Sequence, residues 1–183
     1  MRGSDPLKSI RALAAEFESA AWFTRCAALL SGEEQREAEQ YLGGLHLPAF
    51  RIENVSDWEG AGATTQRADW SREWWDAEAR EAGRLKSLAA TRLGEVPLLA
   101  ALSTLTEAAA ALYLPAAVAA GHAGIEDQTL IRVAAGAGAM AAHQMGLVLA
   151  AEAGIDHPLS RKYRLFSGGR WLLGVMGECC YLF

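Results

Sequence analysis

Two stretches of the chain carry almost no charge, and each places a single ionisable side chain near its middle. The stretch 98–121 has Glu107 as its only charged residue, and the stretch 133–151 has His143 as its only ionisable group. A helix that is apolar around most of its circumference is buried in a protein core or in a bilayer. A lone Glu or His in such a helix needs a partner, because burying an unpaired polar group is costly. The pattern predicts two buried helices in which Glu107 and His143 are partnered.

The short connection around Gly124 is expected to make these two helices antiparallel neighbours. Folding the chain there pairs positions whose numbers add to about 249, which brings Glu107 close to His143. Small residues such as Ala111 and Gly138 would let the two backbones approach closely. We expect a buried Glu107–His143 pair with shifted pKa values. It would act either as a general acid and base or as a structural pair that fixes the register of the helices.

Capping side chains and prolines divide the remaining helical sequence into elements. Asp or Ser in front of a segment with helical apolar spacing is typical of a helix start. Such starts occur at Asp5, Ser31, Asp69 and Asp127. Pro115 lies inside the apolar stretch 98–121 and is expected to kink or divide that helix, because the hydrogen bond back to Ala111 is lost.

The segment 46–69 is predicted as a long loop, because it is rich in Pro, Gly, Asn, Asp and Ser and lacks sustained periodicity. A loop of this length is usually a lid, a binding loop or an irregular wrap. Trp58, Trp70 and Trp74 gather where this segment meets the next helix. They either line an apolar ligand site or pin the segment to the core.

The tail 170–183 has two short apolar runs on either side of Met176-Gly-Glu178, which predicts a β-hairpin. Taken together, the elements predict an all-α fold over residues 1–183, as a single domain. We expect a bundle of five or six helices around the buried apolar hairpin, with a small C-terminal β-hairpin appended.

Composition and charge narrow the class of protein. A net charge of −5 and a pI near 5.4 argue against a nucleic-acid-binding protein, which would show a basic face. No apolar core of a signal peptide follows Met1, so we expect a cytoplasmic protein. The three cysteines lack metal-ligand spacing and are expected to be reduced thiols, with no metal and no cofactor bound. A Glu or His at mid-membrane is costly, so we expect the apolar helices in a protein core and not in a bilayer.

The basic run that contains Arg161 and Arg164 either receives an anion or an acidic partner, or is solvated surface. No catalytic constellation beyond the Glu107–His143 pair is present. We therefore expect a soluble binding or accessory protein that self-associates, as a homodimer, or binds an apolar small molecule or a protein partner. The alternative is a small enzyme that uses Glu107 and His143 in an apolar pocket closed by the segment 46–69.

Overall fold

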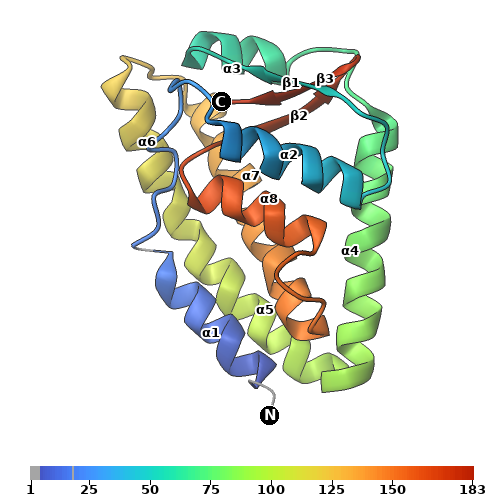
Figure 1. Cartoon of the computed structure of the whole chain (residues 1–183). Helices are drawn as coiled ribbons and strands as arrows, with labels where there is room; N and C mark the ends of the chain where they lie inside the picture. The colour runs from blue at the N-terminus through green and yellow to red at the C-terminus, as the bar shows by residue number, and fades with distance from the viewer. Residues whose placement is uncertain (1–4, 18) are drawn as a thin grey trace.

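Helix α7, Gln128–Ala151, runs through the middle of the molecule and is contacted by α1, α4, α5, α6 and α8 (Figure 1). The computed structural model describes residues 5–17 and 19–183. The predicted Asp127 cap is confirmed, since its carboxylate accepts hydrogen bonds from the amides of Thr129 and Leu130 at 2.8 and 3.1 Å. The fold is 65% helical with a small C-terminal sheet, which confirms the predicted class.

The apolar stretch before α7 is one broken helix. Its parts are α5 (Glu95–Ala109), a 3₁₀ turn (Ala110–Leu112) and α6 (Tyr113–His122). The break lies directly before Pro115, whose ring nitrogen has no hydrogen to donate to the preceding turn, so the predicted division is confirmed. A Cβ added to Gly138 would lie 3.3 Å from Leu112 Cδ1, and one added to Gly146 would lie 2.6 Å from Leu105 Cδ2. These contacts place the broken helix antiparallel to α7, close to the predicted register.

Four further helices complete the bundle, with α2 packed on α8. They are α1 (Pro6–Glu16), α2 (Gly32–Gly44), α4 (Arg72–Leu93) and α8 (Pro158–Ser167). The predicted caps Asp5 and Ser31 are confirmed, and Ser31 forms a full capping box with Glu34. The predicted cap Asp69 is wrong. Ser71 caps α4, while Arg67 donates two hydrogen bonds to the Asp69 carboxylate.

The prediction of a loop over 46–69 is wrong, because this segment contains strand β1 (Arg51–Asn54) and helix α3 (Trp58–Thr65). Asp57 caps α3 by accepting from the Gly60 amide at 2.7 Å. Helix α3 consists largely of Gly, Ala and Thr, so its sequence shows little apolar periodicity. With α3, α8 and the divided α5–α6, residues 5–17 and 19–183 form eight α-helical segments, more than the five or six expected.

The tail forms the predicted hairpin, with β2 (Leu172–Met176) antiparallel to β3 (Cys179–Leu182). Strand β1 adds to the other edge of β3 in parallel, with Arg51 opposite Cys179, so the strand order is β1-β3-β2. The last strand of the chain is therefore the central strand of the sheet.

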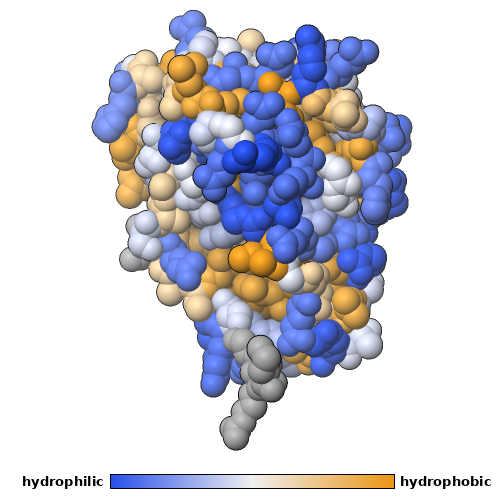
Figure 2. Space-filling model, in the orientation of Figure 1, coloured by the Kyte–Doolittle hydropathy of each residue, from blue (hydrophilic) through white to orange (hydrophobic). Residues whose placement is uncertain are grey.

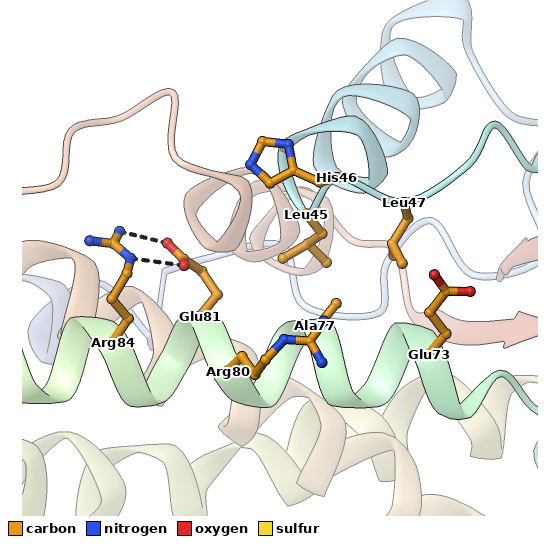
Figure 3. Close-up of a pocket in the computed structure, with 9 residues that line it drawn as sticks. Leu45, His46, Leu47, Glu73, Ala77, Arg80, Glu81 and Arg84 are labelled. Atoms are coloured by element: carbon orange, nitrogen blue, oxygen red, sulfur yellow. Dashed lines mark hydrogen bonds and ion pairs between the residues drawn. The ribbon is translucent and has the colours of Figure 1, made fainter.

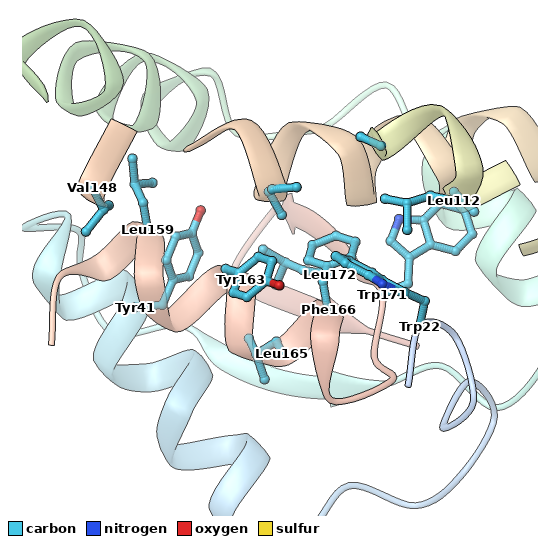
Figure 4. Close-up of a cluster of buried hydrophobic side chains, with 14 of the residues drawn as sticks. Trp22, Tyr41, Leu112, Val148, Leu159, Tyr163, Leu165, Phe166, Trp171 and Leu172 are labelled. Carbon is cyan, nitrogen blue, oxygen red and sulfur yellow. The ribbon is translucent and has the colours of Figure 1, made fainter. Parts of the chain in front are cut away.

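Aromatic side chains from distant segments meet under α7 to form the centre of the core. Figure 4 shows Trp22, Tyr163, Phe166 and Trp171 gathered there. Trp22 packs edge-on against Tyr163, with ring centroids 5.8 Å apart. The loop after α1, helix α8 and the start of the tail are thereby held on one core.

Candidate interaction surface

Glu107 is exposed on the outer side of α5, and the Ser103 hydroxyl donates to its carboxylate at 3.2 Å. Leu102 and Leu105 point inward at α7. Each helical residue turns by about 100°, so Glu107 lies about 200° around the helix from Leu105. The prediction that Glu107 is buried is therefore wrong, although the register that suggested it was close.

His143 lies half-buried on α7, near Lys86 of α4. Burial lowers the pKa of His143, and the charge of Lys86 lowers it further, so the neutral imidazole is favoured. Among the described residues no hydrogen bond or ion pair joins His143 to Glu107. A general acid–base pair needs hydrogen-bond reach, so this geometry gives the catalytic prediction for the two residues no support.

Two of the three predicted ligand-binding tryptophans are core residues. Trp58 packs edge-on against Phe183, with centroids 5.2 Å apart. Trp74 is buried and donates from its indole nitrogen to the Tyr41 hydroxyl at 2.7 Å. Trp70 is half-exposed and lies edge-on to Trp75. Trp58 and Trp74 thus pin their segments to the core, which was the alternative to a ligand site.

The basic residues of α8 are paired within the molecule. Arg164 Nε donates to Glu37 of α2 at 2.7 Å, and Arg161 pairs with the same carboxylate at 3.3 Å. Lys162 is buried and pairs with the buried Glu78 of α4. Neither the predicted anion site nor the predicted solvated surface is found here, because these charges hold α8 between α2 and α4. The acidic residues at helical spacing on α2 and α4 were the sequence signal for this pairing.

A groove of about 520 Å³ lies between the end of α2 and the side of α4 (Figure 3). Leu45 and Leu47 point toward α4, where Arg84 makes two hydrogen bonds to Glu81 at 2.9 and 2.7 Å. Glu81 also bonds to His157 at 2.7 Å, and these partners lower its pKa to about 2 against the opposing effect of burial. The Glu81 carboxylate in the groove therefore already has its hydrogen-bond partners, Arg84 and His157, within the protein. Among the described residues no cluster of three or more His, Cys, Asp or Glu side chains could hold a metal ion.

The most unusual surface of the molecule lies on the broken helix α5–α6. The 28 residues Glu95–His122 have a mean hydropathy of 1.4 in their most apolar window, yet only 28% of that window is buried. Helix α7 has the same hydropathy and is 50% buried. By length and composition, both could cross a membrane.

The exposed positions of this helix recur at intervals of three and four residues, so they form one continuous stripe. We name it the outer α5–α6 face. It consists of Val96, Leu99, Ser103, Glu107, Ala110, Leu114 and Val118, all exposed. Val96 and Leu114 are the most open of its apolar side chains, at 78% and 68% exposure. Glu107 is its only charge.

A second exposed strip lies on α7, at Val133, Gly136 and Met140. Gly138 and Gly146 of α7 face Leu112 and Leu105, and this strip lies about 150° around α7 from those glycines, so it is separate from the outer α5–α6 face. Figure 2 shows hydrophobic residues along the edge where Figure 1 places α6, whereas hydrophilic residues cover α2 and α8. This surface was not predicted, because an apolar helix was expected to be buried around its whole circumference. Leucines occur on both sides of this helix, with Leu102 and Leu105 buried and Leu114 exposed, so the sequence did not fix the phase of the helix.

No family model, curated protein or solved structure matches this chain.

Proposed function

We propose that this protein is a non-catalytic binding protein that self-associates, with two copies meeting through their outer α5–α6 faces. The observation that carries the proposal is the low burial of the most apolar helix of the chain. On a protein in aqueous solution, a contiguous exposed apolar surface of this extent marks an interaction site. Closed two-fold dimers are the commonest assemblies of identical chains.

The size of the surface fits a dimer. A 28-residue helix is about 42 Å long and about 10 Å wide, so one exposed side offers roughly 400 Å². A stable interface buries about 800 Å² on each partner, and weak interfaces are smaller, so the outer α5–α6 face fits a weak, reversible dimer.

The side chains on the outer α5–α6 face are arranged so that the face complements itself. Small residues, Ser103 and Ala110, flank its middle, and larger ones, Leu99 and Leu114, lie farther out. Two packed helices are closest where they cross and diverge toward their ends. Small side chains on either side of Glu107 permit close approach beside the crossing point, and larger ones bridge the wider gaps.

A bilayer is the competing occupant of an apolar helix face. Inserting this face would carry Glu107 into the hydrocarbon with no second carboxyl group to share a proton, which is costly for a carboxylate. The second helix of suitable length, α7, packs against α4 and α8 of the same molecule. These features favour a second copy of the chain.

The test compares two matched substitutions by light scattering on a sizing column. Leu114→Glu puts a charge in the outer α5–α6 face, and Leu29→Glu puts the same charge at a leucine that is 86% exposed outside it. We expect the unmodified protein and Leu29→Glu to be dimers, and Leu114→Glu to be a monomer with an unchanged circular dichroism spectrum. An unmodified protein that is monomeric, or that floats with liposomes, would overturn the proposal, as would a dimeric Leu114→Glu.

A further inference from the structure

We infer that Glu107 makes this self-association pH-dependent, because the Glu107 carboxyl groups of two copies meet at the dimer axis and share a proton. The inference rests on the proposed dimer and specifies how it is regulated.

The position of Glu107 carries the argument. Glu107 lies midway between Val96 and Val118, the two ends of the outer α5–α6 face. If a two-fold axis pairs the helices antiparallel, Val96 meets Val118 and Ser103 meets Ala111 of the other copy, and Glu107 meets its own equivalent. If the two-fold axis runs parallel to the helices, the two helices are parallel and every residue meets its equivalent in the other copy. Both symmetric arrangements centred on this face juxtapose the two carboxyl groups.

Within residues 5–17 and 19–183 of one copy, no charged group pairs with this carboxylate. Its hydrogen-bond donor is the uncharged hydroxyl of Ser103. The described residues include no ion pair to Glu107. Three helices pack against α5. Their charged or titratable side chains are Lys8, Arg11 and Glu16 of α1, Arg132 and His143 of α7, and, near the C-terminal end of α4, Lys86 and Arg92. Arg92 is already paired with Glu152.

Two carboxylates brought together in an apolar interface repel each other, and the pair then holds one proton more readily than two separate groups do. On association at mildly acidic pH, a proton from solvent binds one carboxylate. The resulting hydroxyl donates a hydrogen bond to the other carboxylate, leaving one negative charge on the pair. The dimer therefore binds one more proton than two monomers. Linkage then makes the association constant rise as the pH falls, by up to about tenfold per pH unit.

The experiment measures the dimer dissociation constant by sedimentation velocity from pH 5 to pH 8. The variant is Glu107→Gln, and the matched control is Glu95→Gln, an exposed glutamate of the same helix outside the outer α5–α6 face. Circular dichroism at each pH verifies that the chain remains folded.

For the unmodified protein and Glu95→Gln, we expect the dissociation constant to rise with pH, by up to about tenfold per unit. Glu107→Gln should remove this dependence and bind at least tenfold more tightly than the unmodified protein at pH 8, because two neutral amides can face each other without repulsion. A dimer of pH-independent affinity, or a Glu107→Gln variant that keeps the dependence, would overturn this inference and leave the proposed dimer standing. If the unmodified protein and the Glu107→Gln variant are monomeric at every pH, this inference and the proposed dimer are both overturned.

Discussion

Glu34 connects three parts of the chain through one carboxylate. It accepts from the backbone amide of Ser31 at 2.7 Å, pairs with Arg25, and receives two hydrogen bonds from Arg170 at 2.8 and 3.1 Å. Arg170 is fully buried and also donates to the carbonyl oxygens of Ala28 and Leu29. A buried guanidinium requires such compensation, so Glu34 attaches the start of the tail to α2.

The first prediction concerns acid stability. Burial tends to raise the pKa of Glu34, but the hydrogen bonds from Arg170 and Ser31 outweigh it and lower the pKa to about 2. Because the folded pKa lies below the ordinary value of 4.5, the ionised form stabilises the fold above about pH 4.5, and this contribution is lost as the pH falls toward 2. Glu34→Gln should reduce the free energy of unfolding at pH 7 by about 2 kcal/mol, with a smaller deficit at pH 3, measured by urea denaturation.

Glu33→Gln is the control for this prediction, because Glu33 is an exposed neighbour in the same helical turn. It should leave the free energy of unfolding nearly unchanged at both pH values. Equal effects of Glu33→Gln and Glu34→Gln would show that the connection through Arg170 does not stabilise the fold.

At the scale of elements, the close packing of α5 on α7 depends on a glycine. A Cβ at Gly146 would lie 2.6 Å from Leu105 Cδ2 and 3.2 Å from Leu102 Cδ2. Leu105 is fully buried, so its side chain has little room to move. The missing side chain at Gly146 is therefore what lets the two helices approach.

We predict that Gly146→Ala destabilises the protein by about 1–2 kcal/mol, since overpacking outweighs the gain in helix propensity. The control is Gly83→Ala in α4, where an added Cβ meets no atom within 4 Å. That substitution should stabilise the protein by about 0.5–1 kcal/mol. Thermal unfolding of both variants tests the pair of effects, and a neutral or stabilising Gly146→Ala would contradict the packing described.

Local signals in the sequence were sufficient to predict several helix ends. The caps Asp5, Ser31 and Asp127 and the division at Pro115 follow from interactions within a few residues. Strand β1 could not be found in this way, because its partner β3 lies 128 residues later in the chain, as the Arg51–Cys179 pair shows. A four-residue strand gains its identity from that distant partner.

At the scale of the whole molecule, the sequence could not decide which side of the apolar helices would be covered. That outcome depends on how many other helices pack around them. Helix α7 is surrounded by five helices, whereas α5–α6 keeps one side open. The register between the two was predictable from the short connection at Gly124. The burial of Glu107 was not, because it depends on the phase of the helix relative to its neighbours.

The self-associated state is the central claim, and the mass of the unmodified protein in solution tests it most directly. Sedimentation equilibrium at pH 6, over concentrations from about 1 to 100 μM, covers the range in which a small, weak interface is expected to associate. We predict that the mass approaches twice the 19.6 kDa of one chain as the concentration rises. A mass that stays at 19.6 kDa over the whole range would contradict the account.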